Sequence, residues 1–263
     1  TIYEKLVTEL LQEGKVFLWQ VLLLQWNTLA RINNIGSMIW NTLGWRDDHC
    51  VLKWAKSKKD QTGKRCTEIS LFANPSNFKL CPITALGIRL AEEDVRAGHN
   101  IVFSGSASDK YSNELRKFLK QMKGSIEGLL LGTHSVRKGA TSHAAMAGLV
   151  SDVLISVLLR GQWDIGAVMG RYFKVHKTGD AMVGRIVAGL DVNGAGFASL
   201  PPHFVEWNDS LQNILVRQFP ADRTPLHNHK AHLLTQMLMA SLLFHRQAAD
   251  FMSARPGRRR SAS

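Results

Sequence analysis

The sequence predicts a mainly α-helical protein with one small antiparallel β-sheet. Apolar residues recur at helical spacing through most of the chain, which indicates amphipathic helices. One short segment alternates between apolar and polar residues, and a second such segment follows it after a lysine-rich turn. With 263 residues and 45% hydrophobic content, the chain is long enough to bury a sizeable core. We therefore expect an α+β fold.

In the N-terminal part we expect one helix before a β-hairpin and one helix after it. The elements, in chain order, are a helix over 2–30, a strand over 50–55, a polar turn over 56–65, a strand over 66–72 and a helix over 83–97. Leu6, Leu10 and Leu11 give the first helix its apolar spacing, and Gly14 is its main interruption. Residues 36–44 show no regular pattern.

In the C-terminal part, capping residues mark where helices begin. The expected caps are Ser108, Thr133, Ser151 and Asp164, and the last of these helices should end near Tyr172. The helix after Ser151 should stop near Gly161. Residues 191–203 are rich in glycine and proline and indicate a boundary, followed by a helical region over 226–252 and a basic tail over 255–260.

The charge balance points to a polyanionic partner. A net charge of +12 and a pI near 9.9 favour nucleic acid, because basic side chains release counterions from phosphates; the alternative is a domain that is merely basic. Cys50, Cys66 and Cys81 are odd in number and lack a Cys-x-x-Cys pair, which argues against a disulfide framework and for a reducing compartment. The apolar run over 17–26 is too short to span a bilayer and predicts a buried helix. We find no signal peptide, and the start at Thr1 suggests a fragment.

Three short segments suggest a phosphate site. His134 and Arg137 are three residues apart, so a helix places both on one side, where a guanidinium can hold two phosphate oxygens and an imidazole can add a donor or relay a proton. Trp163 and Tyr172 follow, nine residues apart. Each residue alone is typical of ordinary packing. Their joint order suggests a phosphate held by cations beside a nucleophilic hydroxyl, an arrangement that can break and rejoin DNA.

The segment Gly-Thr-His-Ser-Val-Arg-Lys-Gly-Ala at 132–140 resembles the signature of the tyrosine recombinases, or phage integrase family. The similarity is greatest to the eukaryotic crypton-like branch, whose pattern the segments 72–75 and 81–87 also resemble. Arg31 stands where that family keeps its first catalytic arginine, and Lys58 where it keeps a hairpin lysine. Trp163 stands at the third His-or-Trp position and Tyr172 at the nucleophile. The resemblance covers about residues 20 to 190.

The resemblance implies the recombinase catalytic fold and a 3′-phosphotyrosine intermediate. Tyr172 would attack a DNA phosphate while Arg31 and Arg137 stabilise charge on its oxygens. Lys58 would protonate the departing 5′ oxygen, and His134 would assist proton transfer. The Trp163 indole would donate to the phosphate or buttress the site. The reaction needs no ATP, metal or other cofactor, because ligation is the reverse of cleavage and the bond energy is kept in the phosphotyrosine link.

The expected partner is double-stranded DNA. Further basic residues would contact it: Lys56, Lys59, Lys64, Lys138 and Arg171. The same resemblance implies a homo-oligomer on DNA and integration of a mobile element. We expect no membrane or small-molecule partner and, because the sequence shows no signal peptide or spanning segment, a nuclear location if the source is eukaryotic. We expect residues 1–20 to be a remnant of an N-terminal DNA-clamping domain or a first core helix, 21–190 the catalytic domain and 191–263 a C-terminal extension.

Some positions depart from the family pattern. Asn34 stands where the family often has an acidic residue that orients the arginine helix, and Arg46 is a poorer alternative to Arg31. Lys56, Lys59 and Lys64 compete with Lys58 for the hairpin lysine. A protein that binds DNA without cutting it is therefore the second reading. A type IB topoisomerase-like enzyme and a basic interaction protein without DNA chemistry are the others.

The C-terminal region carries fewer signals. His227, His229 and His232 lack a carboxylate or cysteine to complete a metal site, so we expect them on a polar helix face. The apolar helix over 233–251 should pack on the core or on a neighbouring protomer. The basic tail is expected to touch phosphate or to act as a nuclear address.

Overall fold

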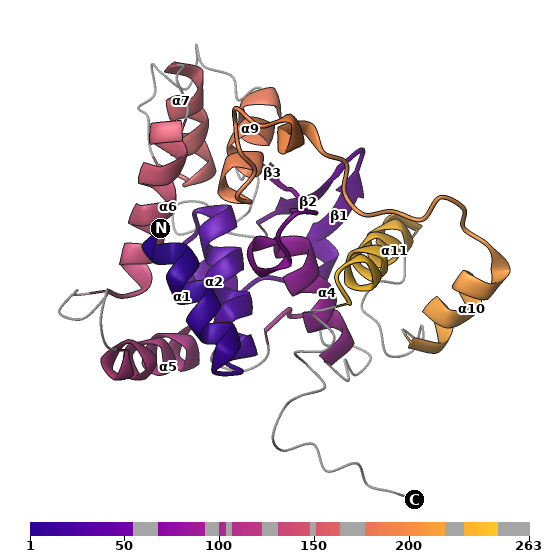
Figure 1. Ribbon diagram of the computed structural model, residues 1–263, viewed down its shortest axis with the longest axis horizontal. Helices are drawn as coiled ribbons and strands as arrows, with labels where there is room; N and C mark the ends of the chain where they lie inside the picture. Colours follow the sequence, from indigo (N-terminus) through magenta and orange to yellow (C-terminus); the bar gives the residue numbers. More distant parts are fainter. Residues whose placement is uncertain are drawn as a thin grey trace, which may run out of the picture.

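The computed structural model describes residues 1–54, 68–92, 100–103, 107–122, 131–147, 151–163, 177–218 and 229–246. Within these residues the protein is mainly helical with one three-stranded antiparallel sheet, as the sequence predicts. Figure 1 shows α1, α2, α5, α6 and α7 on one side of the sheet and α11 on the other. The helices are α1 (Ile2–Gln12), α2 (Val16–Thr28), α3 (Ile32–Gly36), α4 (Pro82–Glu92), α5 (Ala107–Gln121), α6 (Thr133–Ala147), α7 (Ser151–Arg160), α9 (Lys177–Val187), α10 (Asp209–Gln218) and α11 (His229–Phe244). Short 3₁₀ turns are η1 (Trp40–Thr42), η2 (Phe78–Leu80) and η3 (Ala195–Ala198).

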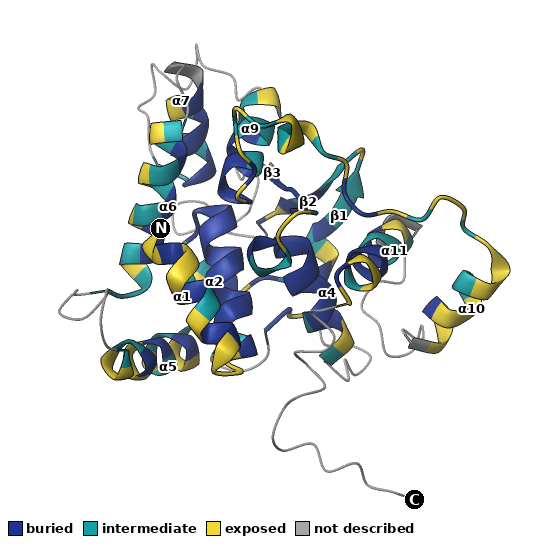
Figure 2. Ribbon diagram, viewed as in Figure 1, coloured by how far each residue is buried: buried dark blue, intermediate teal, exposed yellow. Residues whose placement is uncertain are grey.

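The predicted N-terminal helix is two helices. α1 ends at Gln12 and α2 begins at Val16, because Gly14 adopts a left-handed backbone with φ of +62°. All residues of α2 except Phe17 are buried, which confirms that the apolar run is a core helix. Figure 2 shows α2 in dark blue along most of its length. α2 is therefore a central element, and α1, α3, α4, α5, α6 and α9 pack around it.

The sheet has one strand more than the predicted hairpin. Strands β1 (Leu43–Arg46), β2 (His49–Lys53) and β3 (Glu68–Leu71) lie in the order β1-β2-β3. The register of the sheet pairs Cys50 of β2 with Trp45 of β1 and with Leu71 of β3. β1 was not predicted because its alternation extends over only four residues, and its extended form is fixed by pairing with β2. Asp47, with φ of +50°, makes the turn between them.

Small residues let α6 approach α2. Ala140 and Ala144 are fully buried, and a Cβ added at Gly139 would lie 3.2 Å from the Trp26 ring. The Gln25 side chain donates from Nε2 to the carbonyl of Thr133 at 2.9 Å, which fixes the start of α6 against α2. Thr133 is the first residue of α6 rather than a cap; the Ser135 hydroxyl instead accepts from the Gly132 N–H.

A buried ion pair joins α7, α9, β3 and α2. The Arg160 guanidinium donates to Asp180 Oδ1 at 2.6 Å, to the Ser70 carbonyl at 2.8 Å and to the Asn27 carbonyl at 2.7 Å. The other Asp180 oxygen accepts from the Ser70 N–H at 2.7 Å. α9 also lies very close to β3, since a Cβ at Gly184 would be 2.5 Å from the Ser70 carbonyl. The end of α7 is thereby anchored to the core.

The C-terminal helices differ in how they are held. α11 packs on α4 and β1, with Leu234 and Leu238 in the core and the Ser241 hydroxyl 2.9 Å from that of Thr84. α11 thus packs on the core, one of the two expected alternatives. α10 was not predicted and stands at the outer end of the molecule in Figure 1. None of the described helices is long and apolar enough to cross a membrane.

Candidate functional site

Two of the predicted arginines lie near each other. Arg137 is on α6 and is 6% exposed, whereas Arg31 immediately precedes α3 and is partly exposed. Burial lowers the pKa of Arg137 to about 10, and the positive charge of Arg31 acts in the same direction. Burial and the charge of Arg31 both disfavour the charged form of the Arg137 guanidinium. A bound anion would offset both, so this environment favours anion binding.

Arg137 is oriented by the loop that follows α7. Its Nη2 donates to the carbonyl of Gly161, and its guanidinium carbon lies 4.1 Å from the centroid of the Trp163 ring. A cation stacked on an indole in this way is held electrostatically by the ring face. Arg137 is therefore fixed by two residues of one short loop, and the structure brings the predicted Trp163 into direct contact with it.

The loop has a narrowly defined shape. The Trp163 ring covers Gly161 so closely that a Cβ there would be 1.7 Å from a ring carbon. Gln162 takes a left-handed backbone with φ of +56°, and the Trp163 N–H closes the turn onto the Leu158 carbonyl at 2.9 Å. Only glycine can occupy position 161 without moving the ring.

Comparison with protein-family models, with curated proteins and with solved structures finds no match to this chain.

His134 and Lys138 are exposed on α6, four residues apart and thus on one side of the helix. Both are open to a ligand approaching α6. The remaining predicted site residues lie outside the part of the chain that the structure describes: Lys56, Lys58, Lys59, Lys64, Arg171 and Tyr172. The helix expected over 164–172 and His227 lie outside it as well. These positions stay predictions.

Arg46 is engaged elsewhere. Its Nη1 forms an ion pair with Glu68 at 2.8 Å, and that carboxylate raises the pKa of Arg46. Arg31, by contrast, is the arginine whose charge acts on Arg137. The structure thus favours Arg31 over Arg46 as the partner of Arg137. His232, one of the three C-terminal histidines, hydrogen-bonds Gln212 and Gln236, in keeping with a polar helix face.

The sequence reading missed the residues that position the site. Arg160 and Asp180 anchor the end of α7 directly before Gly161, but a single arginine at a helix end carries no signal of a buried ion pair. The sequence marks Asn34 only as a departure from the recombinase pattern, which often has an acidic residue there. In the structure its Nδ2 donates to Gln162 Oε1 at 3.4 Å and so links α3 to the loop after α7.

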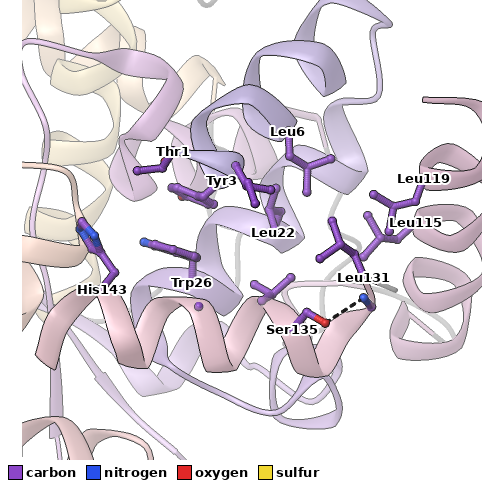
Figure 3. Close-up of a pocket in the computed structure, with 14 residues that line it drawn as sticks. Thr1, Tyr3, Leu6, Leu22, Trp26, Leu115, Leu119, Leu131, Ser135 and His143 are labelled. Carbon is purple, nitrogen blue, oxygen red and sulfur yellow. Dashed lines mark hydrogen bonds between the residues drawn. The ribbon is translucent and has the colours of Figure 1, made fainter. Parts of the chain in front are cut away.

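The opposite face of α6 lines an apolar cavity of about 310 Å³. Figure 3 shows it between α1, α2, α5 and α6, with Tyr3 lying over Trp26 and with His143 and Ser135 on the α6 side. The rings of Tyr3 and Trp26 stack at 3.8 Å. Its described walls are largely apolar and offer no guanidinium, so this cavity is not suited to a phosphate. The arginine face of α6 is the candidate functional site.

Proposed function

We propose that this protein cleaves and rejoins DNA strands through a 3′-phosphotyrosine intermediate, as a tyrosine recombinase does. The observation that carries the proposal is the environment of Arg137. Its guanidinium is buried, stacks on Trp163 and lies near a second arginine, and within the described residues neither Arg137 nor Arg31 forms an ion pair with a carboxylate. Two cations without an acidic partner, together with a basic chain of net charge +12, favour a phosphate of DNA as the anion that this site binds.

The proposed reaction uses this anion site to stabilise a transition state. The Tyr172 hydroxyl oxygen forms a bond to phosphorus, and the bond from phosphorus to the 5′ oxygen breaks. Arg31 and Arg137 stabilise the charge that develops on the non-bridging oxygens. Lys58 gives a proton to the departing 5′ oxygen, and His134 assists removal of the tyrosine proton. Rejoining runs in the reverse direction.

The spacing of the chain supports this assignment for Tyr172. The residue stands nine positions after Trp163, whose ring already contacts Arg137. A chain segment of that length can return a side chain to the same phosphate. The proposal extends to double-stranded DNA as substrate, to assembly of several copies on it, and to integration of a mobile element in a nucleus.

The test is a covalent adduct on a nicked suicide substrate drawn from a randomised duplex pool. The unaltered protein should form an adduct that survives a denaturing gel, and Tyr172→Phe should form none. Tyr111→Phe is the matched control, because the Tyr111 hydroxyl is fully buried and has no hydrogen-bond partner in the described part of the chain, so its removal should leave the fold intact. An adduct that persists in Tyr172→Phe would overturn the assignment of the nucleophile.

A second candidate function is DNA binding without cleavage. The neutral Asn34, which stands where the family often has an acid and pairs with the neutral Gln162, favours it. Under this alternative the protein binds duplex DNA with a strong salt dependence but gives no adduct with any substrate. Loss of that binding in Arg137→Met would still locate the interface at the same site.

A further inference from the structure

A side-chain contact joins the segment that carries Arg31 to the loop that orients Arg137. Arg31 precedes α3, and Asn34 is three residues further along, so the two lie on neighbouring positions of the same turn. The Asn34 Nδ2 donates to Gln162 Oε1 at 3.4 Å. Gln162 in turn sits between Gly161, whose carbonyl accepts from Arg137, and Trp163, whose ring covers Arg137. The Asn34–Gln162 contact therefore connects the segment of Arg31 to both contacts of Arg137.

Gln162 adopts a conformation that a free loop residue would avoid. Its backbone lies in the left-handed region, with φ of +56°, which is rare for a residue other than glycine, asparagine or aspartate. Its Nε2 is buried and has no hydrogen-bond partner among the residues that the structure describes. Strained residues and unpaired buried groups persist only where their surroundings fix them, and both kinds concentrate at functional sites. Here both occur in one residue, at the point where the segment of Arg31 meets the loop that orients Arg137.

We propose that Gln162 is a positioning residue that sets Arg31 and Arg137 at the separation needed to hold one phosphate together. The inference rests on the proposed function only in taking that phosphate from DNA. Without the link, α3 and the loop after α7 can move apart, and each arginine then binds the anion singly. Loss of Gln162 should thus weaken anion binding although both guanidiniums remain.

The first experiment is a double-mutant cycle read by binding of inorganic phosphate and of a short labelled duplex at fixed low salt. Gln162→Gly removes the amide and tolerates the left-handed backbone, so the fold should survive. We expect binding about tenfold weaker, the effect of losing about one well-aligned charge-assisted hydrogen bond. In the background of Arg31→Ala the same change should have little further effect. Independent, multiplicative losses would overturn the proposal.

The second experiment tests the link itself. Asn34→Gln and Gln162→Asn each alter the combined length of the pair, whereas the exchanged double variant restores it. We expect both single variants to bind phosphate more weakly and the exchanged pair to recover binding. Asn33→Ala is the control, since Asn33 is exposed on the same helix. Equal binding by Gln162→Asn and the unaltered protein would overturn the inference.

The two proposals fail in different ways. If the protein binds phosphate and the cycle shows coupling but no adduct forms, the strand-cleavage proposal falls and the positioning role stands. If an adduct forms and Gln162→Gly is as active as the unaltered protein, only the positioning role falls. If the unaltered protein does not bind phosphate or duplex DNA at all, both are overturned.

Discussion

Replacing Asp180 by asparagine should destabilise the protein strongly, because it leaves a charge buried without its counterion. The side chains of Arg160 and Asp180 are 0% and 6% exposed, and their closest atoms are 2.6 Å apart. Both Asp180 oxygens accept hydrogen bonds, one from Arg160 and one from the Ser70 N–H. An asparagine offers one oxygen and one NH₂ group, so one of the two donors would face another donor.

The size of the effect follows from this geometry. Removing one partner of a buried ion pair typically costs about 3–5 kcal/mol. With a urea m-value of about 2–3 kcal/mol/M, such a loss lowers the midpoint of unfolding by about 1–2.5 M. Urea titration at pH 7, followed by far-UV circular dichroism, measures that shift for Asp180→Asn. Because Arg160 directly precedes the loop that orients Arg137, phosphate binding should weaken as well.

Two further variants sharpen this test. Arg160→Met in the Asp180→Asn background removes both charges, so the double variant should be less destabilised than the sum of the single changes. Glu68→Gln is the control, because its ion pair with Arg46 is exposed and should contribute less than about 1 kcal/mol. If Asp180→Asn is no more destabilising than Glu68→Gln, the reasoning from burial is refuted.

The structure predicts the outcome of two glycine substitutions and of one chemical modification. Gly161→Ala should displace the Trp163 ring and weaken phosphate binding about tenfold or more, measured by titration with inorganic phosphate. Gly184→Ala should destabilise the fold by about 2–3 kcal/mol in urea titration, because its Cβ would lie 2.5 Å from the backbone carbonyl of Ser70. Burial raises the pKa of the Cys50 thiol from 9.0 to about 12, so a thiol reagent at pH 8 should modify it only after unfolding. Since the folded state holds this proton more tightly, its contribution to stability should fall as the pH rises from 9 to 12.

Each of these predictions has a control or a contrary outcome. Gly139→Ala is the control for both glycine variants, because the added Cβ would meet only the edge of the Trp26 ring at 3.2 Å. Alanine also favours a helix over glycine by about 1 kcal/mol. The stability and phosphate binding of this variant should hardly change. Comparable losses in Gly139→Ala would show that steric closeness is not the cause. Rapid modification of Cys50 in the native protein would contradict its burial.

Local patterns in the sequence identified most of the regular elements. The spacing of Leu6, Leu10 and Leu11 predicts α1, the apolar run predicts the buried α2, and Ser151 marks the start of α7. Hydrophobic periodicity and capping act within a few residues, so one sequence is enough to reveal them. α10 was missed although Asn208 caps it and its apolar residues recur at helical spacing. β1 was missed because an alternation of only four residues is too short to stand out.

The sequence also proposed the residues of the site, and the structure brings some of them together. Arg137 and Trp163 are in contact, and the charge of Arg31 acts on Arg137, although Arg31 is far from both along the chain. That much followed from the order of motifs. The roles of Tyr172 and Lys58 stay predictions.

The tertiary structure decided how the site is held. The Arg160–Asp180 pair, the Asn34–Gln162 contact and the Trp163 ring over Gly161 all join residues by side-chain geometry that no local pattern encodes. The ion pair alone joins α7, α9, β3 and α2, whose residues are up to 133 positions apart. Helices and strands follow from short-range periodicity, whereas the environment of a buried charge depends on every element packed around it. The sequence by itself therefore determined most of the elements and the candidate arginines, and only the packing determined which groups orient those arginines.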